Sequence, residues 1–387
     1  MSAQLDRKRA ALLGLALGDT FGAPVQGWSV SEVRSFFGGY AALPSAWPAE
    51  ARGLAVERRK RMGPMGLHSA ATQQALALVN ISAGPAGWCG RRWADWLIEG
   101  FVADAWRGSD LHFMGAVHRL RKGRDHRGAG ALFPSAASAA RAAPLGALYT
   151  DNETQLCDVV YESTLVTHGT IRAAAAAHAV ATATADLVRG VEPAEIRRTL
   201  AVRVSDGEAR WRPQAAWAFE RGGFGRVPEA IEALFSTPLG GPETVRASVK
   251  ALAEAVWTEA DGPLGINGDH AALAALHGLA MALRDDVSPD ECLAQVVSLG
   301  GASSAAGAIC GALLGARFGA GWLAPSRLLD GARIEGYADA LAGAVALESR
   351  EAFMGAEAEW TRRRGVFIEG MVAERRTGRP RPVEAPS

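Results

Sequence analysis

The residues of this chain that could act on a bound molecule lie in a few short segments of small and polar residues. Two histidines, His68 and His168, titrate near neutral pH and could transfer a proton. The polar residues near them are mostly serine, threonine and glutamine. These hydrogen bond a polar ligand but cannot serve as strong bases or anionic metal ligands. The residue types therefore predict a ligand pocket that is polar and carries little charge.

An early segment combines glycines with a single acidic residue. Gly18 and Gly22 allow a second backbone to approach closely, and Asp19 can accept hydrogen bonds from free backbone amides nearby. Gln26 follows four residues after Gly22 and has the hydrogen-bonding shape of a glutamate without its charge. We expect this segment to line the pocket from the end of an apolar helix.

Two further segments stand directly before helix-like stretches. Residues 68–74 read His-Ser-Ala-Ala-Thr-Gln-Gln, and residues 300–305 read Gly-Gly-Ala-Ser-Ser-Ala. The position of Ser69 predicts an N-cap, because a serine hydroxyl can accept from the first free amides of a helix. Ser303 and Ser304 are expected at another helix N-terminus, where the backbone dipole favours an anion.

Two segments in the middle of the chain complete the set. Residues 135–146 are rich in alanine and contain Ser138 and Arg141, and residues 167–169 read Thr-His-Gly before a long alanine-rich stretch. Arg141 could bind a phosphate group or pair with a buried acid.

Taken in their order along the chain, the five segments resemble the ADP-ribosylglycohydrolase (DraG-like) superfamily, over about residues 10 to 325. In that family the segment that matches residues 69–73 reads roughly T-D-D-T-Q, and the segment that matches residues 300–305 reads G-G-D-T-D-T. Their carboxylates hold two divalent ions, usually magnesium or manganese, beside the scissile ribosyl bond. Positions that are acidic in the family are neutral here, namely Gln26, Ala70, Ala71, Ala302 and Ser304. The resemblance therefore implies a divergent member without this metal site and without another cofactor.

The resemblance also implies which side chains face the ligand. The expected catalytic residues are His168, His68 and Gln26. The expected substrate-binding residues are Asp19, Ser69, Thr72, Gln73, Ser138, Gly169, Ser303 and Ser304, and no metal ligand is expected. Residues 135–137 read Ser-Ala-Ala where the family has G-N-G, and the lost glycine flexibility weakens the expected phosphate clamp. The family pattern favours a structural role for Arg141.

Apolar residues at helical spacing and many alanines predict an almost entirely helical chain. The clearest predicted helices cover residues 6–17, 70–81, 92–106, 170–188, 244–259, 271–283 and 304–318. Alternation typical of strands is scarce, so the predicted fold class is all-α. The expected architecture is a compact multi-helix bundle of the ADP-ribosylglycohydrolase type. We expect one domain over residues 1–370 and a disordered tail over 371–387, which is rich in proline and arginine.

Composition narrows the classes of partner. Lys+Arg and Asp+Glu number 41 each and the formal net charge is +0, whereas nucleic-acid-binding proteins usually have a basic excess. No apolar run reaches membrane-spanning length and the N-terminus lacks a signal-peptide pattern, so we expect a cytoplasmic protein. The four cysteines form no C-x-x-C pair, which argues against a zinc site. The expected partner is a small nucleotide-like or nucleoside-like ligand, and the low net charge is compatible with an oligomer.

Two functional hypotheses follow, and a third is disfavoured. The first is a metal-independent enzyme acting on the glycosidic bond of an ADP-ribosyl, NAD-derived or related nucleoside compound. The second is a pseudoenzyme, a binding or regulatory protein that keeps the scaffold. The third is a metal-dependent hydrolase with ligands from elsewhere. Its candidate acids, Asp151, Glu153, Asp158 and Glu162, have the spacing of the solvated side of a helix.

Overall fold

The computed structural model describes residues 2–217, 223–252, 256–257, 269–285, 288–343 and 345–377. Across these ranges the protein contains helices and no β-strand, which confirms the all-α prediction, and Ala131 and His168 form an isolated parallel bridge. The α-helices are α1 (Ala3–Gly22), α2 (Val30–Phe37), α3 (Val56–Arg59), α4 (Ala70–Ala83), α5 (Gly90–Val102), α6 (Leu111–Arg121), α7 (Ala137–Ala140), α8 (Ala143–Leu148), α9 (Glu153–Leu165), α10 (Ile171–Arg189), α11 (Pro193–Trp211), α12 (Arg226–Phe235), α13 (Pro242–Ala251), α15 (Ala271–Ala282), α16 (Pro289–Ser298), α17 (Ser303–Phe318), α18 (Gly331–Leu341) and α19 (Arg350–Thr377). None of the described helices has the length and hydropathy that a membrane-spanning helix needs.

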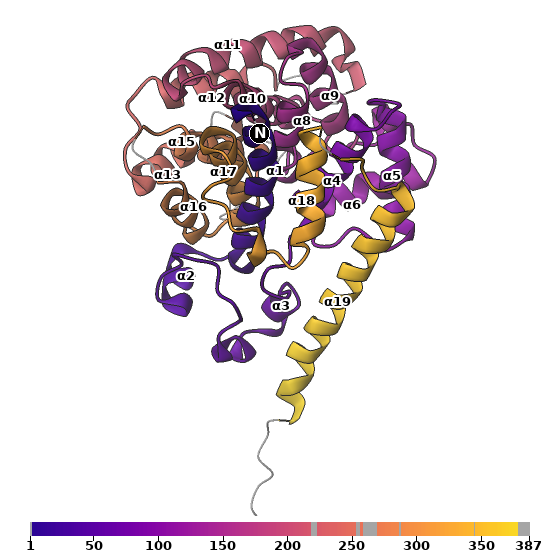
Figure 1. The fold of residues 1–387 in the computed structure, drawn as a ribbon, viewed down its shortest axis with the longest axis vertical. Helices are drawn as coiled ribbons and strands as arrows, with labels where there is room; N and C mark the ends of the chain where they lie inside the picture. The colour runs from indigo at the N-terminus through magenta and orange to yellow at the C-terminus, as the bar shows by residue number, and fades with distance from the viewer. Residues whose placement is uncertain are drawn as a thin grey trace, which may run out of the picture.

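Helices α1 and α17 cross in direct backbone contact at the centre of the molecule, where they lie side by side in Figure 1. A Cβ atom on Gly18 would lie 1.9 Å from the carbonyl oxygen of Gly307, and one on Gly14 would lie 2.0 Å from that of Gly311. A Cβ atom on Gly22 would lie 2.2 Å from the carbonyl oxygen of Ser303. The helices are therefore antiparallel, and the last turn of α1 meets the first turn of α17.

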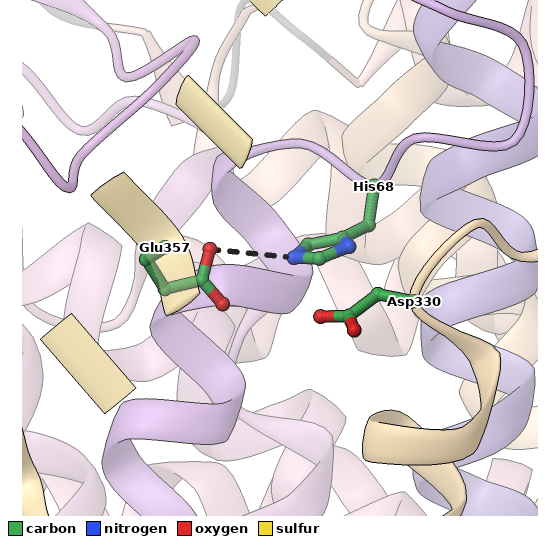
Figure 2. Close-up of side chains that lie close together, drawn as sticks. All are labelled: His68, Asp330 and Glu357. Atoms are coloured by element: carbon green, nitrogen blue, oxygen red, sulfur yellow. Dashed lines mark ion pairs between the residues drawn. The ribbon is translucent and has the colours of Figure 1, made fainter. Parts of the chain in front are cut away.

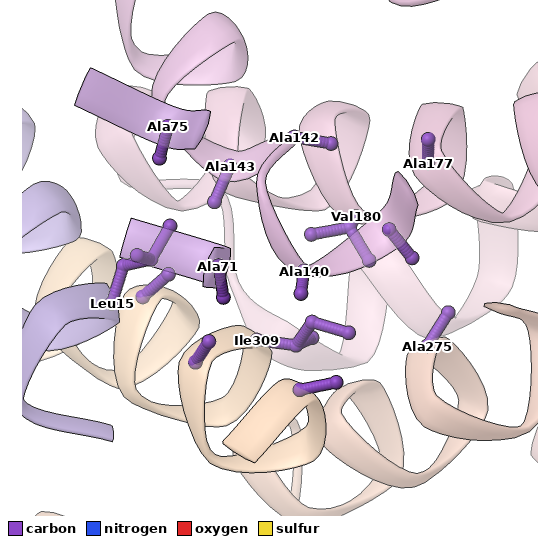
Figure 3. Close-up of a cluster of buried hydrophobic side chains, with 14 of the residues drawn as sticks. Leu15, Ala71, Ala75, Ala140, Ala142, Ala143, Ala177, Val180, Ala275 and Ile309 are labelled. Carbon is purple, nitrogen blue, oxygen red and sulfur yellow. The ribbon is translucent and has the colours of Figure 1, made fainter. Parts of the chain in front are cut away.

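Helix α10 is buried around its whole circumference, as expected for a helix without a polar face. It begins where the Thr170 hydroxyl accepts from the amide of Ala173, and it ends at Gly190 in the left-handed conformation. Figure 3 shows Ala177 and Val180 of this helix near Ala140 of α7 and Ala275 of α15. These small residues bring the helices close together, so the residues at their ends meet in space.

The predicted helices are found. One of them ends earlier than predicted, and another extends in the prediction beyond the described residues. Helix α5 ends at Val102, four residues before the predicted end, because the Trp106 ring folds back. Its Nε1 atom donates to the carbonyl of Leu97 at 2.9 Å, and Gly100 leaves room for the ring. The turn carries residues 105–107 to the start of α4. The end of the predicted helix 244–259 lies outside the described residues.

The predicted tail is partly helical. Helix α19 continues to Thr377, seven residues into the segment 371–387 that we expected to be disordered, and residues 378–387 lie outside the described part. The buried guanidinium of Arg59 holds the start of this extension, since it donates to the carbonyl of Met371 at 2.5 Å. Figure 1 shows α19 running past α5 at one end and towards α3 at the other. The single domain over residues 1–370 remains a prediction.

Candidate functional site

Asp19 is the point at which three of the sequence segments converge. Its carboxylate, completely buried in α1, accepts five hydrogen bonds. Oδ2 accepts from the Ser69 amide at 2.8 Å and from the amide and hydroxyl of Thr72 at 3.1 and 2.7 Å. Oδ1 accepts from the hydroxyls of Ser69 and Ser304 at 2.5 Å each. The Asp19 centre thus joins the ends of α1, α4 and α17.

The Asp19 centre also explains how two helices begin. Ser69 occupies the predicted N-cap position of α4, but its side chain makes no capping bond, so that role was wrongly predicted. The Asp19 carboxylate caps α4 instead, by accepting from the free amides of Ser69 and Thr72. Gln26 does the same for α17, because its Oε1 atom accepts from the Ser304 amide at 2.9 Å.

The edge of the Asp19 centre meets solvent at the start of α17. Gln26 is exposed and Ser69 is partly exposed, while Ala302 and Ser304 keep 9% and 8% of their surface exposed. Ser303 points the other way, since its hydroxyl donates to the carbonyl of Gly22 at 2.8 Å and is buried. A ligand at this edge would meet the start of α17 and the neutral side chains of Gln26, Ser69 and Ser304.

His68 lies beside this centre in a buried network of charged residues. Its Nε2 atom is 3.6 Å from the Glu357 carboxylate and is hydrogen bonded by the Arg107 guanidinium, which itself contacts Glu357 at 2.5 Å. Burial, reinforced by the charge of Arg107, lowers the pKa of His68 below its ordinary value. Burial alone would raise the pKa of Glu357, but the charges of Arg107 and Arg333 hold it well below its usual range. We call His68, Arg107 and Glu357, with Gln73, Asp330 and Arg333, the Glu357 network.

Gln73, an expected substrate-binding residue, is used inside this network. Its Nε2 atom donates to Glu357 at 2.9 Å and to the carbonyl of Ala105, and its Oε1 atom accepts from the Arg107 amide at 3.2 Å. The side chain is completely buried. Gln73 therefore holds residues 105–107 against α4.

His68, Asp330 and Glu357 also form a group that could hold a metal ion. One ligand atom from each lies within 4.8 Å of the others, and Figure 2 shows the two carboxylates near the imidazole ring. Two permanent cations already occupy this space. Arg333 contacts Asp330 at 2.9 Å and Glu357 at 2.7 Å, and Arg107 takes the other oxygen of Glu357. An ion would have to displace these guanidiniums.

A second polar centre surrounds His168. The Arg141 guanidinium donates to the Thr167 hydroxyl at 2.6 Å, and that hydroxyl is 2.9 Å from Nδ1 of His168. On the other side, Nε2 of His168 is 2.7 Å from the Ser135 hydroxyl, which donates to Asp110 at 3.0 Å. We call this series, from Arg141 to Asp110, the His168 chain. Both ring nitrogens of His168 are therefore engaged, and the ring is completely buried.

The His168 chain has a definite direction. Burial by itself would raise the pKa of Asp110, but its hydrogen-bonded neighbours hold it well below its ordinary value, so it is a carboxylate. A carboxylate only accepts, so the Ser135 hydroxyl gives its proton to Asp110 and can only accept from Nε2 of His168. His168 must then donate from Nε2, and burial lowers its pKa so that it stays neutral. This arrangement stabilises the charge of Asp110.

Two other expected substrate-binding residues hold the backbone around this chain. The Ser138 hydroxyl donates to the carbonyl of Ser135 at 3.0 Å, and the Gly169 amide donates to the carbonyl of Ala131 at 2.7 Å. Arg141 has the structural role that the family pattern favours, since it also donates to Gln74 on α4 at 2.6 Å. Arg141 thereby ties the His168 chain to the helix that the Asp19 centre caps.

A family model described as ADP-ribosylglycohydrolase matches residues 1–351. The chain belongs to the ADP-ribosylglycohydrolase family. The match includes all five segments identified above and ends at the second residue of α19.

One solved structure, described as an ADP-ribosylglycohydrolase-related protein complex, is similar to this family member. The likeness covers 89% of this chain and 99% of that chain, with 21% sequence identity and a TM-score of 0.59. At this identity the likeness shows the ADP-ribosylglycohydrolase fold. No curated protein sequence matches the chain.

Sequence reasoning brought together some residues of this family site and missed others. Gln26, Asp19, Ser69, Thr72 and Ser304 meet through hydrogen bonds at the Asp19 centre, and their roles towards a ligand remain a prediction. His168 lies in the separate His168 chain. The missed residues include Asp110, whose position directly before α6 is a recognisable N-cap signal. Asp330 and Glu357 had no local signal, because their role depends on packing against His68.

Proposed function

We propose that this ADP-ribosylglycohydrolase-family protein binds an ADP-ribosyl, NAD-derived or related nucleoside compound and acts on its glycosidic bond without the family's pair of divalent ions. The observation that carries the proposal is the set of hydrogen bonds at Asp19. Its carboxylate lies among the three family segments, and both oxygens accept from neighbouring protein donors.

The donor set at these segments does not fit two hard cations. Magnesium and manganese need several oxygen ligands, mostly carboxylates, whereas Ala70, Ala71 and Ala302 offer no side-chain oxygen. The hydroxyls of Ser69, Thr72 and Ser304 direct their protons to Asp19. In the Glu357 network, the guanidiniums of Arg107 and Arg333 take the place that a cation would need. These contacts support a site that works without a bound divalent ion.

The chemistry available to such a site favours a substrate with a reactive bond. The N-terminus of α17 and the exposed amide group of Gln26 can orient phosphate or ribose oxygens. A histidine can add general acid-base assistance of about 10²–10⁴-fold. This is modest for an unactivated glycosidic bond, so we propose a substrate whose leaving group is already activated.

The second candidate function is a pseudoenzyme that binds the same class of ligand for a binding or regulatory role. The contacts of two expected catalytic residues favour it. Both nitrogens of His168 are engaged in the His168 chain, and the amide oxygen of Gln26 caps α17. None of these three atoms can assist a reaction without breaking its present hydrogen bond.

The two functions are separated by measuring binding and turnover on one metal-free preparation. ADP-ribose, NAD and adenosine are titrated by calorimetry, and the same mixtures are analysed by chromatography for cleaved products. The proposal expects binding heat together with product. Binding without product would assign the pseudoenzyme role, and no heat with any of the three would refute both functions.

A variant of the exposed Gln26 locates the ligand. Gln26→Ala removes one polar group at the edge of the Asp19 centre, and about tenfold weaker binding is expected from one lost hydrogen bond. Gln4→Ala, an exposed glutamine at the start of α1, is the matched control and should bind as the wild type does. Equal binding by Gln26→Ala would place the ligand elsewhere.

A further inference from the structure

Helix α19 contributes a buried carboxylate to the candidate site, although it lies almost entirely beyond the family match, which ends at residue 351. Glu357 is completely buried and is hydrogen bonded by Arg107, Gln73 and Arg333. A buried carboxylate is costly unless each oxygen finds donors, and Glu357 finds them on both. This extension is therefore part of the interior of the protein.

The contacts of the His68 ring decide where its proton sits. The guanidinium of Arg107 has only donors, so Nε2 of His68, which it contacts, must be the accepting nitrogen. The ring is neutral at ordinary pH, since burial and Arg107 lower its pKa. A neutral ring carries one proton, and this proton is therefore on Nδ1. Figure 2 shows Nε2 on the side of the ring towards Glu357 and the second nitrogen on the other side.

The Nδ1 atom of His68 has no hydrogen-bond partner in the structure, although the residue is only 1% exposed. Buried donors are nearly always satisfied, so an unsatisfied one suggests an acceptor that binds there. His68 directly precedes Ser69, and the charge of Asp19 acts on its ring. The residue that carries this unsatisfied donor is thus the direct neighbour of a member of the Asp19 centre.

We infer that Glu357 is a positioning residue of this site, through which α19 holds His68 as a hydrogen-bond donor to the bound ligand. Glu357 fixes the Arg107 guanidinium at 2.5 Å, and Arg107 in turn keeps the His68 proton on Nδ1. The Nδ1 donor then meets an oxygen acceptor of the ligand, such as a ribose hydroxyl or a phosphate oxygen. This last step rests on the proposed function, whereas the position of the proton does not.

The proton position can be measured directly on the full chain. Long-range proton–nitrogen NMR of protein labelled with ¹⁵N-histidine distinguishes the two neutral forms of His68, and a His68→Gln spectrum assigns the signal. The wild type should show the Nδ1-protonated form, and ADP-ribose should shift its signal. A wild-type ring protonated on Nε2 would overturn the inference without need of a further variant.

The role of Glu357 is tested with a matched pair of variants on the same helix. Glu357→Gln removes the charge that holds Arg107, whereas Glu359→Gln changes a partly exposed acid that pairs with Arg362 and Arg363. For Glu357→Gln we expect a mixture of both ring forms and ADP-ribose binding weakened about tenfold or more, as for loss of one well-placed hydrogen bond. Glu359→Gln should match the wild type in both measurements.

The outcomes separate this inference from the proposed function. If the wild type binds no ADP-ribose but the ring form changes only in Glu357→Gln, the positioning role holds and the proposed function fails. If a folded Glu357→Gln keeps the wild-type ring form, the positioning role is refuted. Should Glu357→Gln fail to fold, Glu357→Asp, which keeps the charge on a shorter side chain, gives the same comparison.

Discussion

The carboxylate of Asp19 and the hydroxyl of Ser304 lie 2.5 Å apart, although 285 residues separate them in the chain. This contact joins the last turn of α1 to the first turn of α17, where the glycines of both helices bring the backbones together. Ser69 completes the junction from α4. The fold and the candidate site therefore depend on the same few atoms.

Replacing Asp19 by asparagine should destabilise the protein. Asparagine has one accepting oxygen, and its amide group would face donors that now point at a carboxylate. We expect a loss of about 2–5 kcal/mol in the free energy of unfolding, as for several buried donors left unsatisfied. Urea unfolding followed by circular dichroism measures it. The exposed Asp95→Asn is the control, and a change of Asp19→Asn as small as that of the control would contradict the role of Asp19.

The crossing of α1 and α17 predicts a steric effect at Gly18. In Gly18→Ala the new methyl group would lie 1.9 Å from the carbonyl oxygen of Gly307, so the helices must separate. We expect a loss of about 2–4 kcal/mol, at the upper end of overpacking effects. Gly336→Ala in α18 is the control, because no atom lies within 4 Å of the added group. That variant should gain about 0.5–1 kcal/mol from helix propensity.

Divalent metal ions should have little effect on this protein. The Asp19 carboxylate already accepts five hydrogen bonds, and guanidiniums occupy the Glu357 network, so we expect no stoichiometric binding of magnesium or manganese. Elemental analysis after dialysis measures bound metal, and the melting temperature with and without EDTA measures its effect on stability. One or more ions retained per chain would contradict the metal-independent proposal. Loss of that ion in His68→Ala would then assign it to the group of His68, Asp330 and Glu357.

Stability should fall as the pH is lowered from about 6.5 to about 4, in part through His178. Burial and the charge of Arg203 lower the pKa of His178 to about 4, whereas the unfolded chain has an ordinary histidine pKa of about 6.5. The unfolded state therefore binds the proton first as the pH falls. The stability contributed by His178 is complete above about 6.5 and is lost towards about 4, amounting to about 3 kcal/mol.

The comparison of two histidine variants isolates this effect. Unfolding in urea is measured from pH 7 to about pH 4 for the wild type, His178→Asn and His118→Asn, the last being an exposed histidine on α6. The slope of stability against pH should be smaller in His178→Asn and unchanged in His118→Asn. A wild-type slope in both variants would show that His178 does not contribute.

The sequence alone determined the helices and the family segments, because both depend on neighbouring residues. Apolar spacing and alanine content predict helices such as α10, and the order of the short segments identifies the family. Local reasoning also placed Ser69 at the start of α4. It assigned the capping to the wrong side chain, because Asp19 lies 50 residues away in the chain.

Only the tertiary structure decided which polar groups are available to a ligand. Gln73 was predicted to contact a ligand, but residues from α19 and the turn after α5 use its side chain. The neutral form of His68 depends on Arg107, which lies 39 residues further along the chain. Arg107 in turn is held by Glu357, another 250 residues away. A hydrogen bond forms wherever packing brings donor and acceptor together, and packing follows from the whole chain. The glycines of α1 and α17 therefore predict that two backbones approach closely. Only the tertiary structure shows that this approach places Ser304 of α17 against Asp19 of α1.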